Sequence, residues 1–300
     1  MKILVNRTPV KGPWGGGNLL VRSLYEILPD MGVKVVSNFE DDIDIIFMQD
    51  PRYGDTGISI NEIISYKNFR NSVKIVHRVN ECDARKGTKD VDNLLRECSK
   101  HTDHTVFVSN WMKSHHLKMG WNCDEISVIY NGVNKSHFSK GEKINNGKIN
   151  IVTHHWSNNR MKGFDIYDRL DEFVGQNNDF TFTYIGRENG TFKNTNVIEP
   201  LFGKELGRCL SQYDVYISGS LFDPGPNHIL ESISCEIPTY VHSSGGGCIE
   251  FAGESHVYNS FEKLKSILES KTYNENSFTP HDWRECMRQY FNLFKSLCSV

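Results

Sequence analysis

The polar stretch Ser139-Lys-Gly-Glu-Lys-Ile-Asn-Asn-Gly-Lys148 is followed at once by the apolar run Ile149-Asn-Ile-Val-Thr153. Polar segments rich in Gly, Asn and Ser are typical of connections between structured elements. On both sides of this segment, short apolar runs alternate with amphipathic stretches. We therefore predict a linker at 141–148 that separates two domains, the second of which begins with a buried strand.

Toward the N-terminus, the apolar runs predict buried strands separated by helices. The first predicted helix has Leu20, Leu24 and Leu28 on one face and ends at Gly32. The predicted strands are 2–6, 33–36, 43–48, 73–79, 105–108 and 127–129. Strands that alternate with helices imply parallel pairing. Residues 1–140 are therefore expected to form a Rossmann-like domain.

The same alternation follows the linker. Strands are predicted at 149–153, 180–185, 215–218 and 239–241, and helices near 164–174, 204–211 and 228–235. These segments predict a second Rossmann-like domain over 149–279. Thr279 and Pro280 mark the start of a last helix over 280–297, with Asp282 completing a capping-box pattern. Its apolar stripe favours packing against the protein, and a membrane-surface or dimer face remains an alternative.

Composition narrows the class of protein. The 300 residues contain 34 Lys and Arg against 37 Asp and Glu, a net charge of −3 that does not favour a nucleic-acid partner. No apolar run approaches the roughly 18 residues that a membrane-spanning helix needs. The eight cysteines are scattered without a Cys-x-x-Cys pair, which argues against a disulfide framework and a zinc ribbon. We expect a reduced, cytoplasmic protein.

Two segments between a predicted strand and a predicted helix suit phosphate binding. Gly15-Gly16-Gly17 lets an anion approach the backbone at a helix start, although an ordinary tight turn is an equal alternative. Arg160 and Lys162 in Asn158-Asn-Arg-Met-Lys-Gly-Phe164 place positive charge at a second helix start, where a solvated basic turn is the alternative. The adjacent His154 and His155 favour packing and substrate contact over metal binding.

The stretch Ser218-Gly-Ser-Leu-Phe-Asp223-Pro-Gly-Pro-Asn-His-Ile-Leu-Glu231 has two carboxylates around a turn that opens a helix. Such a turn offers backbone N–H groups to sugar or phosphate oxygens, and the carboxylates can accept hydrogen bonds from paired hydroxyls. This mixture of donors and acceptors is typical of polyol binding.

Together, in this order, the segments resemble the retaining family-4 glycosyltransferases of GT-B architecture. Asp223 to Glu231 resembles their Glu-x7-Glu signature, with Asp in the first place. Arg160-Met-Lys-Gly163 resembles the diphosphate-binding segment, with Trp156 where an Arg is frequent. Further matches are Gly15–Asn18, Val106–Met112 with Val128–Val133 and Phe138, and Tyr184–Arg187 beside the base.

The resemblance implies two Rossmann-like domains facing across a cleft, with the last helix crossing back to the first domain. It implies transfer of a hexosyl group from a nucleotide-diphosphate sugar to an acceptor hydroxyl, with retention, in glycan or polysaccharide biosynthesis. Neither metal nor cofactor is expected. The acceptor, the nucleotide base and the oligomeric state stay open, as does a peripheral membrane contact.

By the same resemblance we assign site residues. Catalytic roles are expected for Lys162, Asp223, Glu231 and His77. Donor contacts are expected from Gly16, Gly17, Arg160, Lys162, Gly186, Arg187, Gly225, Asn227, His228 and Glu231. Acceptor-side candidates are Arg78, Asn80 and Asn110.

Four other functions remain as alternatives. A metal-dependent GT-A glycosyltransferase would use an Asp-x-Asp motif, for which Asp42-Ile-Asp44 and Asp90-Val-Asp92 are the matches. A sugar-nucleotide epimerase would turn over without an added acceptor. A non-catalytic nucleotide-sugar-binding protein would bind the donor without turnover. A dehydrogenase would bind NAD.

Overall fold

The computed structural model describes residues 1–11, 15–52 and 57–298, and their contacts divide the chain into two compact units. The first unit comprises Met1–Gly132 and Trp283–Val300, and the second comprises Val133–Asp282. Each unit contains one six-stranded sheet, and the described strand pairs are all parallel. The predicted α/β class with two Rossmann-like halves is confirmed.

The sheet of the first unit has the strand order β2-β1-β3-β4-β5-β6. Its strands are β1 (Lys2–Val5), β2 (Lys34–Val36), β3 (Ile45–Met48), β4 (Lys74–Val79), β5 (His104–Phe107) and β6 (Ile126–Val128). Every residue of β3 is buried, as expected for a parallel strand that is covered on both faces. The chain reverses its direction across the sheet between β1 and β3, so ligands are expected at the carboxyl ends of these strands.

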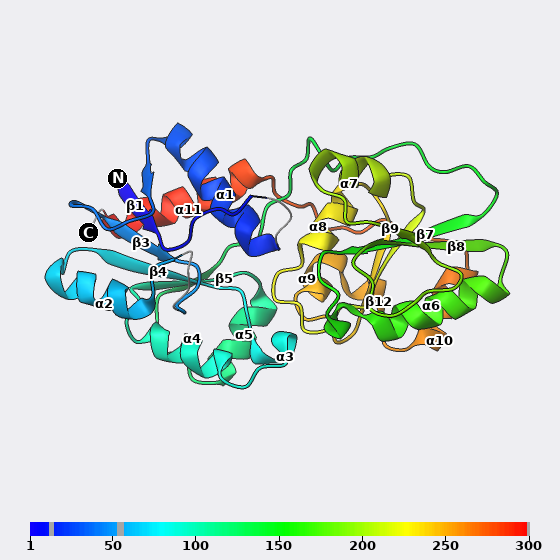
Figure 1. Cartoon of the computed structure of the whole chain (residues 1–300), viewed down its shortest axis with the longest axis horizontal. Helices are drawn as coiled ribbons and strands as arrows, with labels where there is room; N and C mark the ends of the chain where they lie inside the picture. Colours follow the sequence, from blue (N-terminus) through cyan, green and yellow to red (C-terminus); the bar gives the residue numbers. More distant parts are fainter. Residues whose placement is uncertain (12–14, 53–56, 299–300) are drawn as a thin grey trace. The chain divides into compact units, whose positions relative to one another are not determined.

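Helices cover both faces of this sheet (Figure 1). One face packs against α1 (Gly16–Ile27), its continuation η1 (Leu28–Met31) and α11 (Trp283–Cys298). The other face carries α2 (Ile60–Phe69), α3 (Asp83–Lys86), α4 (Val91–Ser99) and α5 (Asn110–Lys118). Gly32 caps η1 with a φ of 80°, a left-handed conformation that suits glycine, which confirms the predicted end of the first helix.

The last helix packs on the first unit, as predicted. Cys286, Met287, Tyr290 and Phe294 are fully buried and share one core cluster with α1, β1 and β3. The helix begins at Trp283, three residues later than its predicted start at 280. The preceding backbone is extended instead, because the Val133 N–H donates to the His281 carbonyl at 2.9 Å and Asp282 bridges to Val133.

The sheet of the second unit has the strand order β12-β11-β10-β7-β8-β9. Its strands are β7 (Ile149–His155), β8 (Phe180–Gly186), β9 (Asn196–Ile198), β10 (Val215–Ser218), β11 (Thr239–His242) and β12 (Val257–Tyr258). Here the direction reverses between β7 and β10. The loops that follow these two strands contain Lys162 and Asp223, so the sequence motifs lie at the expected edge.

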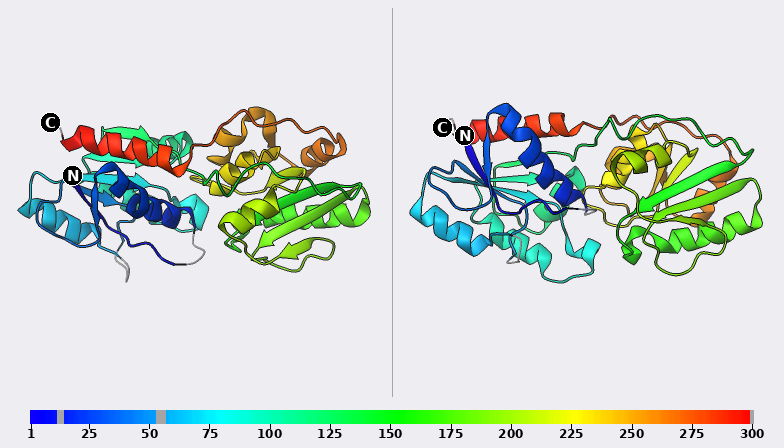
Figure 2. Two further views of the ribbon diagram at one scale, coloured as in Figure 1. Left: turned by 90° about the horizontal axis from the view of Figure 1, so that it is seen from above. Right: turned by 45° about the horizontal axis from the view of Figure 1, so that its top comes forward.

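One face of this sheet packs against α6 (Phe164–Gln176) and α10 (Phe261–Glu269). The other face carries α7 (Gly203–Leu210), α8 (Asn227–Ser234) and α9 (Cys248–Ala252), an arrangement that can be followed in Figure 2. Two short 3-10 turns complete the unit, η2 (Arg160–Lys162) and η3 (Glu254–His256). This distribution follows from right-handed crossovers that run in opposite directions from β7 and β10.

The predicted linker differs from the observed division. Residues 141–148 belong to the second unit, and the chain passes between units after Gly132 and after Asp282. The polar segment packs because its groups find partners there: the Ile144 N–H donates to the Gln212 carbonyl at 2.9 Å, and Lys143 Nζ donates to the Tyr213 carbonyl at 2.6 Å. The polar composition of residues 141–148 did not distinguish a loop that packs within one unit from a linker between two units.

Candidate functional site

The candidate site of the second unit lies at the carboxyl ends of β7, β8 and β10. Lys162 Nζ and Asp223 Oδ2 are 3.4 Å apart, with side chains that are 21% and 8% exposed. Such a charged pair is too accessible to be part of the core and too buried to be an ordinary surface pair. A Lys ammonium has three donors, so it can keep the carboxylate and still contact a phosphate.

Backbone contacts fix this pair. The Leu221 N–H donates to the Met161 carbonyl at 2.9 Å, which joins the loop after β10 to η2. The loop approaches Gly163 so closely that a Cβ there would lie 2.3 Å from the Gly219 carbonyl carbon. Gly163 also has a φ of 104°. Only glycine fits a position that combines a left-handed backbone with so close an approach.

Glu231 on α8 is held by His154 at the end of β7. His154 Nε2 lies 2.8 Å from Glu231 Oε2, and the two side chains are 8% and 14% exposed. One carboxylate oxygen is thus oriented by the protein, while the carboxylate retains lone pairs that can accept hydroxyl groups. Sequence reasoning favoured packing and substrate contact for His154 and did not predict this hydrogen bond, since nothing in the sequence pairs residues that are 77 positions apart.

The neighbouring polar rings also have protein partners. His155 Nε2 lies 2.6 Å from the Tyr167 hydroxyl, and His228 Nε2 lies 2.9 Å from Ser218 Oγ. The Tyr167 hydroxyl also accepts from the Gly219 N–H at 3.0 Å. His154 and His155 therefore have different hydrogen-bond partners, Glu231 and Tyr167. Within the described ranges, no three metal-binding side chains gather at this edge.

An aromatic and cationic platform lies at the end of β8. The Arg187 guanidinium stacks 3.9 Å above the Trp156 ring, whose edge meets Phe202 at 5.7 Å. Gly186 permits this arrangement, because a Cβ there would lie 1.9 Å from the His155 carbonyl oxygen. At position 156, where the resembled glycosyltransferases frequently have an Arg, this chain has a ring that packs under an Arg from the next loop.

The other predicted donor residues have these places. Arg160 ion-pairs with Asp165 and, at 3.5 Å, with Asp168 on α6, and its side chain is 53% exposed. Gly225 lies in the loop after β10, and Asn227 is the first residue of α8. Arg160 is therefore oriented toward α6, whereas Lys162 is oriented toward the carboxylate of the β10 loop.

The candidate residues of the first unit form a buried polar network. Arg78 Nη1 donates to Gln49 Oε1 at 3.1 Å, and its Nη2 donates to Asn131 Oδ1 at 2.6 Å. Gln49 Nε2 donates to Asn80 Oδ1 at 3.2 Å. Arg78 is only 1% exposed and its guanidinium contacts both Gln49 and Asn131, so it orients the other side chains of this network. Asn80 lies just beyond the end of β4.

The start of α1 adjoins this network. A Cβ on Gly17 would lie 3.2 Å from Gln49 Nε2, so the first turn of the helix is close to the amides. Gly16 and Gly17 are the first two residues of α1, where backbone N–H groups lack helical acceptors. Asn110 opens α5 and donates to the Tyr130 hydroxyl at 2.7 Å.

His77 requires a correction. It lies inside β4 with no exposed surface, and its ring stacks on Trp121 at 6.2 Å. Neither ring nitrogen has a hydrogen-bond partner among the described residues. Burial lowers the pKa of His77 to about 3, so the ring is neutral. A ring enclosed within the first unit is a core residue and not the predicted sugar contact.

The two Asp-x-Asp matches do not form a GT-A motif. Asp44 precedes β3 and accepts the Lys2 N–H at 2.7 Å, which places it at the amino end of the sheet. Asp92 lies in the first turn of α4 and contacts His115. Neither pair follows a strand, as the metal-binding motif would.

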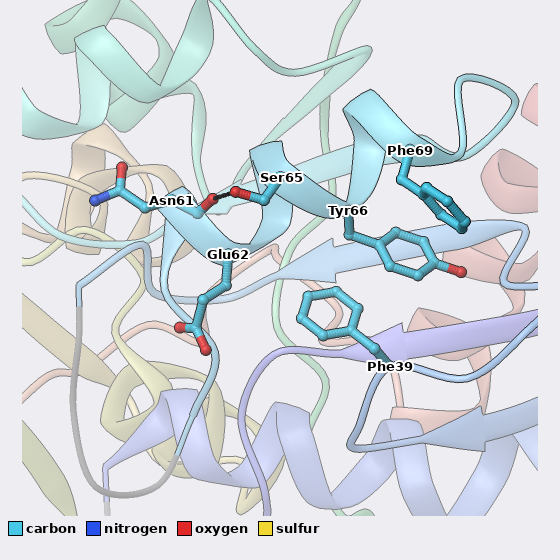
Figure 3. A pocket seen from close by; sticks show the side chains of 6 residues that line it. All are labelled: Phe39, Asn61, Glu62, Ser65, Tyr66 and Phe69. Atoms are coloured by element: carbon cyan, nitrogen blue, oxygen red, sulfur yellow. Dashed lines mark hydrogen bonds between the residues drawn. The ribbon is translucent and has the colours of Figure 1, made fainter.

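A surface hollow of about 490 Å³ lies elsewhere, on the outer side of α2 (Figure 3). The Phe39 and Tyr66 rings stack there at 4.7 Å, and Phe69 is 83% exposed. Its carboxylate, Glu62, is already used in the capping box with Ser59. The described residues that line this hollow include no basic group, so they lack the chemistry of a diphosphate site.

Comparison with solved structures shows the same fold over the whole chain. HepE (Alr3699) of Anabaena, in complex with UDP and glucose, has a TM-score of 0.71 and 12% identity over 98% of this chain and 99% of that chain. Sucrose-phosphate synthase (tll1590) from Thermosynechococcus elongatus has a TM-score of 0.74 and 13% identity, with 99% of each chain covered. The pneumococcal O-GlcNAc transferase GtfA, in complex with UDP and GlcNAc, has a TM-score of 0.63 and 10% identity over 84% of this chain and 56% of that chain.

The fold is therefore that of the GT-B glycosyltransferases. Residues 33–137, about a third of the chain, match the sequence profile of Glycosyltransferase Family 4. No curated protein sequence matches this chain. No helix in the described ranges is both long and apolar enough to cross a bilayer.

Proposed function

We propose that this protein is a glycosyltransferase that moves a hexosyl group from a nucleoside-diphosphate sugar to an acceptor hydroxyl, with retention of the anomeric configuration. The observation behind the proposal is the pairing of Lys162 with Asp223 beside the His154–Glu231 pair, at the switch point of one sheet. Cation, carboxylates and loop backbone are the groups that a sugar diphosphate needs.

Each group of the second unit has a role in this proposal. Lys162 contacts the diphosphate, which gains negative charge as the anomeric bond breaks. One fixed donor at such a position contributes ~3 kcal/mol in the transition state. Asp223 and the backbone around Gly225 position the sugar, with Asn227 and His228 beside it. Glu231 accepts hydrogen bonds from the ribose hydroxyls.

The base of the donor stacks near Trp156 and Arg187. An aromatic ring under a guanidinium presents flat surfaces, and base–aromatic stacking contributes ~1–3 kcal/mol. Two of the similar structures contain UDP with glucose and UDP with GlcNAc, so UDP-sugars are the first donors to test.

The first unit supplies the acceptor side. Asn80 is the acceptor-side group that we favour, and Arg78 orients it through Gln49. Gly16 and Gly17, at the first turn of α1, remain proposed donor contacts. Asn110 remains a further candidate. With His77 in the core, no side chain is assigned as a base. A phosphate oxygen of the leaving group takes the acceptor proton, and the new bond forms on the face from which the diphosphate departs.

A thermal-shift screen of nucleoside diphosphates and their sugars tests the proposal, because a ligand that binds the folded state raises apparent stability. One donor should raise the melting temperature and support transfer without added Mg²⁺ or Mn²⁺, with a product of retained configuration by NMR. Tight binding without hydrolysis or transfer would favour a binding protein. Turnover that requires added Mg²⁺ or Mn²⁺ would contradict charge stabilisation by the protein alone.

A further inference from the structure

A cluster of metal-ligand side chains lies in the first unit, and the proposed donor and acceptor roles do not use it. Asp92 lies in the first turn of α4, and His115 and His116 lie near the end of α5. One ring nitrogen of each histidine and one carboxylate oxygen of Asp92 all lie within 4.8 Å of one another. Asp92 and His116 are buried, while the His115 side chain is 25% exposed and gives access from solvent.

The two ring nitrogens of His116 differ in their hydrogen bonding. Its ring has no exposed surface, and its Nε2 lies 3.3 Å from the Glu81 carbonyl oxygen. A carbonyl only accepts, so Nε2 has the proton and Nδ1 has the lone pair. Within the described ranges, Nδ1 has no hydrogen-bond partner. A buried nitrogen left without a partner costs ~1–3 kcal/mol, which an ion would offset.

The other two groups have outer partners as well. Asp92 Oδ1 accepts the Asp83 N–H at 3.1 Å, which leaves Oδ2 toward His115 Nε2 at 3.0 Å. The His115 ring stacks on Trp111 at 5.5 Å with an interplanar angle of 20°. Metal-binding histidines and carboxylates usually have such partners, which fix the tautomer and the ring orientation.

The core beneath the cluster holds the two helices in place. Val91 and Leu95 of α4 share a buried cluster with Met112 of α5. The His116 ring packs against Phe107, with ring centroids 6.0 Å apart, and against Trp121, with ring centroids 5.1 Å apart. The side chains are therefore positioned by packing and need little rearrangement to meet an ion.

We propose that Asp92, His115 and His116 bind one divalent transition-metal ion of the Zn²⁺ type. Two imidazoles and one carboxylate suit Zn²⁺, whereas Mg²⁺ and Ca²⁺ prefer oxygen ligands throughout. The ion replaces the direct His115–Asp92 hydrogen bond and ties α4 to α5, with a fourth position for water. The site stands independently of the proposed sugar transfer.

Metal titration of the full chain, purified without a histidine tag and stripped with EDTA, tests the site. Wild type should bind one equivalent of Zn²⁺, with a rise in melting temperature, and Co²⁺ should give a visible absorption band. His115→Gln should weaken Zn²⁺ binding at least tenfold and abolish the Co²⁺ band. This variant changes a partly exposed side chain, so folding should be retained.

Asp92→Asn is the second variant, with the same expected loss, and circular dichroism checks its fold. His101→Gln is the matched control, because His101 is an exposed histidine of the same unit. It should bind Zn²⁺ as wild type does. A wild type that binds no Zn²⁺ would overturn the proposal. If both His115→Gln and Asp92→Asn still bind one equivalent of Zn²⁺ as tightly as wild type, the proposal is also overturned, because the ion is then bound elsewhere.

Discussion

Replacing His77 with Phe should remove a large part of the acid sensitivity of the first unit. The ring has no exposed surface and its nitrogens have no partners among the described residues, so the substitution breaks no hydrogen bond. Phe keeps a flat ring but is somewhat larger than His, and added volume in a packed core costs ~1–3 kcal/mol. This cost does not depend on pH, so the test compares the pH dependence of stability and not the stability at one pH.

The sign of the pH effect follows from the lowered pKa. Burial lowers the pKa of His77 to about 3 in the folded chain. The unfolded value is about 6.5, so between these values only the unfolded state binds the proton. The stability that the neutral His77 contributes is therefore fully present above pH 6.5 and is lost as the pH falls from about 6.5 toward about 3. Between pH 7.5 and 4.5 the loss due to His77 is about 3 kcal/mol.

Urea unfolding at pH 7.5 and 4.5, followed by tryptophan fluorescence, measures this loss. The difference in unfolding free energy between pH 7.5 and pH 4.5 should be about 3 kcal/mol smaller in His77→Phe than in wild type. Part of the acid sensitivity should remain, because burial also lowers the pKa of His116, to about 4. His101→Gln, at an exposed position, is the control. Equal pH dependence in His77→Phe and wild type, or NMR titration of His77 near its ordinary pKa, would refute the assignment to the core.

Three further changes test the second unit. Gly163→Ala should lower the free energy of unfolding by at least ~2 kcal/mol, because the added Cβ meets backbone at 2.3 Å. Gly190→Ala is the control, with a similar φ of 117° and no neighbour within 4 Å, and urea unfolding should show a smaller loss for it. Asp171→Ala should lower the free energy of unfolding by ~2–3 kcal/mol and make the loop after β8 more sensitive to proteolysis. The reason is that backbone N–H groups of that loop lose a buried carboxylate that accepts from them at 2.8–3.1 Å. An unchanged rate of cleavage would contradict this prediction. Trp156→Ala should weaken UDP binding about tenfold and leave pyrophosphate binding unchanged, whereas an equal loss for both ligands would exclude a base platform that includes Arg187.

The sequence predicted the elements whose pattern is local. The apolar runs of β3 and β7 and the stripe of α1 indicate burial directly, and Gly32 marks the end of η1. The strands β9 and β12 were missed, because β9 is largely exposed and β12 has only two residues. Short edge strands form through pairing with a longer neighbour, which no local pattern reveals.

The motifs that resemble those of known glycosyltransferases predict part of the candidate site. They do not predict contacts between residues that are far apart in the sequence. Lys162, Asp223 and Glu231 follow from spacing and resemblance. The His154 hydrogen bond to Glu231 depends on how β7 and α8 pack, and sequence spacing contains no such information. His77 shows the converse: the family resemblance suggests a functional histidine, but His77 lies inside a parallel strand that is covered on both faces, so its ring is in the core.

The most direct measurement is calorimetric titration of the full chain with the nucleoside diphosphate that gives the largest thermal shift. Lys162→Ala and Glu231→Ala are each expected to weaken binding at least tenfold, a change of ~1.4 kcal/mol. Lys265→Ala and Glu269→Ala, which break an exposed ion pair on α10, are the matched controls and should bind as wild type does. If folded Lys162→Ala and Glu231→Ala bind the nucleotide as tightly as wild type, the donor does not occupy the carboxyl edge of β7 and β10.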